Sequence, residues 1–117
     1  MINLKEIIYK VAIEAVKGST DIAINKMDFD SRKIGSNDLF IAIRGTQSDG
    51  HDFIEKAILQ GAVAIVCDTF PSEIKDGITY IQVKDTNKAL AIIATNYYNV
   101  FFKYALIALT TFPSLAT

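Results

Sequence analysis

Two short polar segments hold the residues whose types and spacing suit chemistry. Asp30-Ser31-Arg32 places a carboxylate, a hydroxyl and a guanidinium side by side, which supplies hydrogen-bond acceptors, donors and a fork that matches a phosphate. The same residues are typical of a turn, in which Asp30 caps backbone N–H groups and Arg32 is a solvated charge. Judged from spacing alone, the turn is the more common case.

The second segment runs from Gly45 to Asp52 and reads Gly-Thr-Gln-Ser-Asp-Gly-His-Asp. Two glycines flank hydroxyl and amide side chains just before an expected helix, so backbone N–H groups could converge there on an anion. No Gly-Lys-Thr follows, so the segment is not a Walker phosphate loop. The alternative is an ordinary loop in which Asp49 or Asp52 caps the helix.

The single histidine and the single cysteine give weaker signals. A lone histidine at a helix start, such as His51, is more often held by structural hydrogen bonds than used in catalysis. Cys67 ends a continuous apolar run and is expected to behave as a small hydrophobic residue. One residue of each type suits neither a multi-histidine metal site nor an internal disulfide, so we expect neither.

Composition limits the classes of protein that need to be considered. The 117 residues include 12 Lys and Arg against 13 Asp and Glu, and half are hydrophobic, which suits one globular domain. Without a basic block, neither nucleic acid nor an anionic membrane is an expected partner. Charges break the apolar pattern of the first 17 residues, and no apolar run approaches the roughly 20 residues of a membrane helix. These features favour a cytoplasmic protein.

The hydrophobic pattern predicts the elements that position the two polar segments. Apolar residues at helical spacing predict a helix over residues 3–17, and further helices are expected after the second segment, ending at Gly61, and after Asp85-Thr86. Strands are expected over 22–29 (as one strand or two short pieces), 39–43, 62–67, 78–83 and 105–109. This order predicts an α/β fold, a single domain with a mixed sheet flanked by helices. Ligands of such sheets bind beyond the strand ends, which points to the loops after Phe29 and Ile43.

Taken in order, the motifs of this chain resemble the N-terminal domain of the Mur ligases, with the MurE type as the best match. The resemblance covers nearly the whole chain, up to about Thr110. It is carried by Asp30-Ser31-Arg32, by Gly-Ser-Asn-Asp-Leu-Phe-Ile-Ala-Ile-Arg-Gly at 35–45, by Asp-Gly-His-Asp-Phe-Ile at 49–54, by Gly-Ala-Val-Ala at 61–64, and by Asn-Tyr-Tyr at 96–98.

The resemblance implies a function in peptidoglycan precursor synthesis. Domains of this kind bind the uridine diphosphate part of a UDP-N-acetylmuramoyl peptide, and the complete enzyme uses ATP and magnesium to activate a substrate carboxylate for attack by an amino acid. Carried over by motif, the substrate-binding residues are Ser31, Phe29, Thr46, Gln47 and Ser48, and no catalytic residue is assigned. The N-terminal domain of a MurF-type ligase and a ligand-free interaction module remain alternatives.

The C-terminal sequence departs from the family pattern. Where the family continues into a glycine-rich loop with Gly-Lys-Thr, residues 110–117 contain neither glycine nor lysine. We therefore expect residues 1–99 to form the substrate-binding domain and residues 100–117 to be an aberrant or truncated start of the central ATPase domain. Such a chain would bind no cofactor and would be inactive by itself. An exposed strand over 105–109 would favour self-association. A truncated ligase, a disrupted reading frame and a piece that ends at the domain boundary are all compatible with this pattern.

Overall fold

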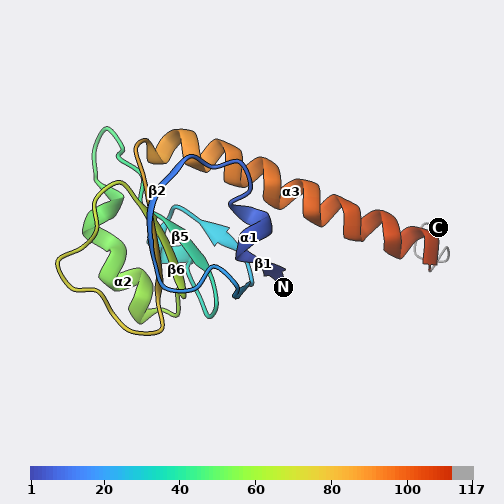
Figure 1. Cartoon of the computed structure of the whole chain (residues 1–117), viewed down its shortest axis with the longest axis horizontal. Coiled ribbons are helices and arrows are strands. Elements are labelled where there is room, and N and C mark those ends of the chain that lie inside the picture. The colour runs from blue at the N-terminus through green and yellow to red at the C-terminus, as the bar shows by residue number, and fades with distance from the viewer. Residues whose placement is uncertain (112–117) are drawn as a thin grey trace.

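The computed structural model describes residues 1–111, and Figure 1 shows a sheet with helices packed around it. The main sheet is mixed and has five strands in the order β2-β7-β6-β5-β4. These strands are β2 (Ile13–Lys17), β4 (Met27–Asp28), β5 (Leu39–Ile41), β6 (Ala64–Cys67) and β7 (Thr79–Val83). Neighbouring strands from β4 to β7 pair in parallel, whereas β2 pairs antiparallel with β7. A separate short pair joins β1 (Ile2–Asn3) to β3 (Ala23–Ile24).

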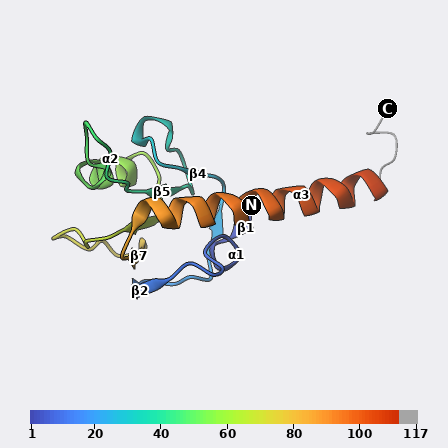
Figure 2. The same cartoon turned by 90° about the horizontal axis from the view of Figure 1, so that it is seen from above.

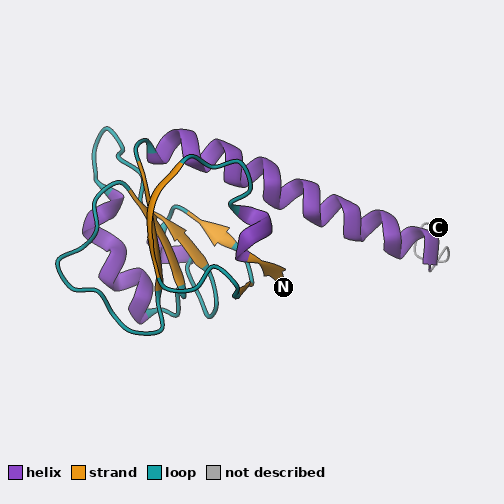
Figure 3. Ribbon diagram, viewed as in Figure 1, coloured by secondary structure: helices purple, strands orange, loops and turns teal. Residues whose placement is uncertain are grey.

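Helices cover both faces of the sheet, as the sequence predicts (Figure 3). One face packs against α1 (Leu4–Ile7) and α3 (Thr86–Thr111), and the other against α2 (Ile54–Leu59). Because side chains alternate along a strand, Leu39 and Ile41 of β5 point to the first face while Phe40 points to the second. All three are buried, which explains why the central strands are continuous apolar runs.

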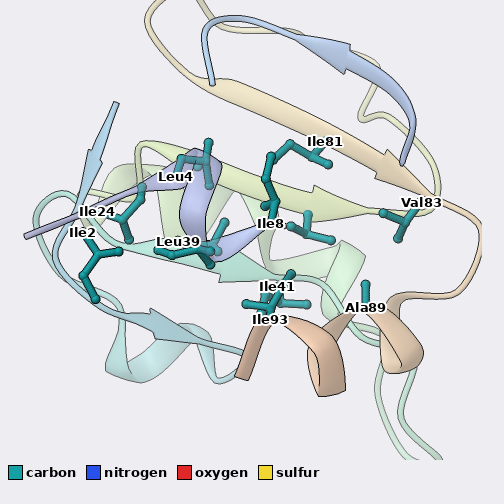
Figure 4. Packing of buried hydrophobic residues seen from close by; sticks show 13 residues of the cluster. Ile2, Leu4, Ile8, Ile24, Leu39, Ile41, Ile81, Val83, Ala89 and Ile93 are labelled. Carbon is teal, nitrogen blue, oxygen red and sulfur yellow. The ribbon is translucent and has the colours of Figure 1, made fainter. Parts of the chain in front are cut away.

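The core on the first face is the larger of the two clusters and determines where α3 lies. Figure 4 shows Leu39, Ile41 and Ile81 from the sheet together with Ala89 and Ile93 from α3. Asp85 caps this helix, since its Oδ1 accepts hydrogen bonds from the N–H groups of Asn87 (3.0 Å) and Lys88 (3.1 Å). The expected helix start at Asp85-Thr86 is therefore confirmed.

The expected helix over 3–17 is wrong. Helix α1 ends at Ile7, Lys10 takes a left-handed backbone conformation (φ 66°), and Ile13–Lys17 forms the edge strand β2. The apolar spacing of this segment is helical, but pairing with β7 supplies backbone hydrogen bonds and a sheet edge that local periodicity does not reveal. Tertiary pairing outweighs the local signal here.

Most of the other expected elements are confirmed. Strands lie within 39–43, 62–67 and 78–83, and the segment 22–29 forms the two short pieces β3 and β4. Two short 3₁₀ helices complete the fold: η1 (Ser31–Lys33) follows β4, and η2 (Gly50–Phe53) directly precedes α2. Gly61 ends α2 with φ 119°, and a Cβ there would lie 2.7 Å from the Cα of Ser36, so this position requires glycine.

The expected strand over 105–109 is also wrong, because α3 continues through it as one 26-residue helix. No glycine or proline interrupts residues 86–111, and an unpaired apolar segment satisfies its backbone groups most simply as a helix. The helix projects outward beyond the body of the fold (Figure 2). Its large apolar side chains there, such as Phe102 and Leu106, are exposed. Self-association through an exposed strand over 105–109 is therefore not supported, because these residues are helical. Residues 112–117, the rest of the predicted C-terminal region, lie outside the residues that the structure describes. No helix within 1–111 is long and apolar enough to span a membrane.

Candidate functional site

A groove of about 460 Å³ opens where β4 and β5 end, which is the place the sequence indicates. One wall is the turn at η1, the opposite wall is the loop after β5, and α2 closes the site between them. Phe29, Ser31 and Ser48 line this groove. Thr46 and Gln47 lie on the same loop but are exposed and do not line the groove, so the structure brings together three of the five predicted residues.

The turn at η1 holds Ser31 at the groove. Asp30 caps the turn by accepting a hydrogen bond from the Arg32 N–H (3.0 Å), and its carboxylate pairs with the Arg32 guanidinium at 2.8 and 3.0 Å. The hydrogen bonds from the Arg32 side chain, and after them the one from its backbone N–H, lower the pKa of Asp30 to about 2. The turn interpretation is thus confirmed for Asp30 and Arg32. Ser31 differs: it is 7% exposed, and no hydrogen bond within residues 1–111 uses its hydroxyl.

The loop after β5 is a closed hairpin-like turn. The Gly45 N–H donates to the Ser48 carbonyl (2.9 Å), and the Gly50 N–H donates to the Ile43 carbonyl (2.7 Å). Asp49, one of the two expected caps, caps η2 by accepting from the His51 N–H at 2.9 Å. The loop therefore presents Ser48 from a backbone that is tied at both ends.

A ring of four side chains anchors the base of this loop to the end of β6. Arg44 pairs with both carboxylate oxygens of Asp68 at 2.7 and 2.8 Å and also contacts Asp49. His51 completes the ring, with Nδ1 2.7 Å from Asp49 Oδ1 and Nε2 accepting the Asp68 N–H at 3.0 Å. This pattern fits the Nδ1–H tautomer and confirms that His51 is held by structural hydrogen bonds.

Both carboxylates of the ring are held in their charged form. The pKa of Asp68 is lowered chiefly by its hydrogen bond with Arg44, and the pKa of Asp49 chiefly by the His51 backbone N–H. The ring is thus an ionised network that supports the loop from outside the groove.

Among the lining side chains that sequence reasoning did not assign to the site are Phe53 and Lys56. They lie three residues apart, so one side of the helical segment after the loop carries both, and this spacing was the available signal. Lys56 forms no ion pair with a carboxylate within the described residues, whereas the Arg32 guanidinium is already paired with Asp30. Lys56 is therefore the cation of the groove that is available to an anionic ligand.

A larger hollow of about 700 Å³ lies at the start of α3. Asp85 already occupies the N–H groups at that helix end, so they are not free to bind an anion. Among residues 1–111, no three His, Cys, Asp or Glu side chains are grouped so that they could hold a metal ion. The groove at Ser31 is thus the better candidate site.

Cys67, at the end of β6, should be unreactive in the folded chain. Its side chain is fully buried, and burial followed by the nearby Asp68 charge raises the pKa of the thiol to about 11. At pH 8 we expect a thiol reagent such as dithionitrobenzoate to modify it at least about tenfold more slowly than in urea-unfolded protein. Equal rates in the folded and unfolded chain would contradict the burial of Cys67.

The fold belongs to a known class of enzymes. Residues 23–98 match the family model described as "Mur ligase family, catalytic domain". This match covers more than half of the chain, so the chain belongs to the Mur ligase family.

Curated relatives of this chain indicate which type of Mur ligase it resembles. The chain is 46% identical over 98 residues to the UDP-N-acetylmuramoyl-L-alanyl-D-glutamate–2,6-diaminopimelate ligase of Cytophaga hutchinsonii, covering 83% of this chain and 20% of that enzyme. It is 48% identical over 99 residues to the enzyme of the same name from Clostridium tetani, with 82% and 20% covered. These relatives are MurE-type ligases matched over their N-terminal region. The chain spans about a fifth of their length.

Solved structures with a similar fold are also Mur ligases. A crystal structure of MurF from Acinetobacter baumannii superposes with a TM-score of 0.53 at 27% identity, covering 62% of this chain and 15% of that one. MurF from Thermotoga maritima, solved in complex with ADP, gives 0.52 at 30% identity over 59% and 16%. These solved Mur ligases thus contain a part that is similar in fold to about three fifths of this chain.

Proposed function

We propose that this chain binds the uridine diphosphate part of UDP-N-acetylmuramoyl-dipeptide and serves as the substrate-binding part of a MurE-type, ATP-dependent amino-acid ligase. The observation that carries the proposal is the Ser31 hydroxyl: Ser31 is a nearly buried residue that lines the groove, and its hydroxyl has no partner among the described residues. A hydroxyl that faces a groove and is not used by the fold is available to a ligand.

The chemistry of the groove suits a nucleoside diphosphate. Ser31 and Ser48 offer hydroxyls that both donate and accept, Lys56 offers a positive charge, and Phe29 and Phe53 offer apolar surface to a base or a sugar. Because the Asp30 and Arg32 charges compensate each other, Lys56 leaves the groove net positive. Thr46 and Gln47, on the exposed end of the loop, would contact the ligand only where it extends beyond the groove.

Ligation itself requires groups that these residues do not supply. ATP provides the phosphoryl group that activates the substrate carboxylate in this family, and no Gly-Lys-Thr sequence occurs in the 117 residues. We therefore propose that the chain alone does not catalyse ligation. Residues 1–99 contain every lining residue of the groove and remain the proposed substrate-binding domain, while α3 passes through residue 99 without a break.

The MurF alternative shares the nucleotide end of the substrate and therefore the proposed role of the groove. The MurF solved structures, which are 27% to 30% identical to this chain, favour the MurF alternative. The two MurE-type relatives described above are 46% and 48% identical to it. The higher identity over a longer aligned segment supports the MurE type.

Ser31→Ala tests the proposal. Loss of one hydrogen bond to the ligand should weaken binding of UDP-N-acetylmuramoyl-dipeptide about tenfold, as measured by isothermal titration calorimetry. Ser36→Ala is the matched control, because Ser36 is exposed and does not line the groove. An unchanged affinity in the Ser31 variant would contradict the site, and no binding by the folded wild-type chain would favour a ligand-free interaction module.

A further inference from the structure

Gln60 connects α2 to the turn that carries Ser31. It lies just after the last residue of the helix, and its side-chain Nε2 donates hydrogen bonds to the carbonyl of Ser31 and to the carbonyl of Ile34, the latter at 3.0 Å. These carbonyls belong to the first residue of η1 and to the residue that caps its end. A single amide group therefore holds both ends of the turn.

Gln60 supports the turn where its own hydrogen bonding is weakest, because the Lys33 N–H donates to the Asp30 carbonyl at 3.0 Å whereas the bond to the Ser31 carbonyl is longer. It is a three-residue 3₁₀ turn, and the Ile34 N–H approaches the Ser31 carbonyl at 3.3 Å, longer than a typical backbone hydrogen bond. The direction of the Ser31 hydroxyl follows from the backbone of Ser31, whose carbonyl Gln60 binds directly. A shift of this backbone would move the hydroxyl within the groove.

Gln60 also relates two walls of the groove. Lys56 precedes it by one helical turn on α2 and lines the groove, whereas Gln60 itself does not. The amide thus keeps the helix that carries the cation at a fixed spacing from the turn that carries the hydroxyl.

We propose that Gln60 is a positioning residue for the ligand of this groove: it contacts no ligand and acts by orienting Ser31. The proposal rests on the proposed binding of a uridine diphosphate compound. It differs from a purely structural role because most of the effect of Gln60 on affinity must pass through the Ser31 hydroxyl, and only a small remainder through the position of Lys56.

A double-mutant cycle between Gln60→Met and Ser31→Ala tests this coupling. Methionine keeps the length of the side chain and removes both donors. With UDP-N-acetylmuramoyl-dipeptide as the titrant, and at a temperature where thermal unfolding curves show every variant folded, Gln60→Met should weaken binding about fivefold in the wild-type background. In the Ser31→Ala background the same change should alter affinity by less than about twofold. Glu55→Gln, an exposed change on the same helix, is the control that should leave affinity unchanged.

The outcomes separate the two proposals. Wild-type affinity in Gln60→Met, or an equal loss in both backgrounds, would overturn the positioning role while leaving the binding function intact, because wild type binds and Ser31→Ala still weakens binding. Absence of binding by folded wild type would overturn the binding function, and the positioning role with it. If Gln60→Met does not fold, Gln60→Asn gives the same comparison, since it keeps an amide that is one methylene short of both carbonyls.

Discussion

Replacing Lys26 with methionine is expected to lower the free energy of unfolding by about 3 kcal/mol. The Lys26 ammonium lies 2.6 Å from Oδ2 of Asp38, whose side chain is fully buried. That oxygen also accepts the Gly35 N–H at 2.7 Å, while Oδ1 has no partner among the described residues. Without Lys26 a buried carboxylate would keep only one hydrogen bond, and the cost of leaving a buried charge unpaired is large.

Urea unfolding curves of the wild type and the variant measure this effect. Lys33→Met is the matched control, because it removes an exposed lysine from the same region without removing an ion pair. Adding Asp38→Asn to the Lys26 variant should recover part of the loss, since the buried group is then neutral. A Lys26 variant as stable as the Lys33 variant would show that the pair does not stabilise the fold.

Gly50→Ala is expected to destabilise the chain by about 3 kcal/mol and to weaken nucleotide binding. A Cβ at this position would lie 2.7 Å from the Ile43 nitrogen and 2.8 Å from the Ile43 oxygen, so backbone would have to move. The Gly50 N–H donates to that same Ile43 carbonyl, and the displacement would break the hydrogen bond that closes the Ser48 loop. Stability and the shape of the groove would therefore change together.

Gly35→Ala is the control for this glycine, because a Cβ there would meet only Asp38 Oδ2, at 3.8 Å. Thermal unfolding and titration with UDP-N-acetylmuramoyl-dipeptide give the two readouts. Equal stability of the two alanine variants would contradict the close approach at Gly50. Lost stability with full affinity would show instead that the groove tolerates movement of the loop.

Local patterns in the sequence correctly predicted the buried strands and the helix caps. The buried strands around Phe40, Ile65 and Ile81 appear as apolar runs because both faces of the sheet are covered. The caps at Asp30, Asp49 and Asp85 follow from short side chains that bond to the next N–H groups along the chain. The strand ends then indicated the correct place for the groove.

The same reasoning failed in two segments whose sequence is compatible with either a helix or a strand. Residues 13–17 carry a helical pattern but pair with β7, and residues 105–109 carry an apolar pattern but continue α3. In both segments the choice depends on whether a neighbouring strand is available, which is not a local property.

The sequence by itself determined the family, the mixed α/β fold and the two segments that form the walls of the groove, because these depend on motifs and on contacts between near neighbours. Only the tertiary structure decided which side chains support those walls. Gln60 reaches Ser31 across 29 residues, and Arg44 reaches Asp68 across 24. Such contacts exist only after the chain has folded, since packing brings together groups that no local spacing connects.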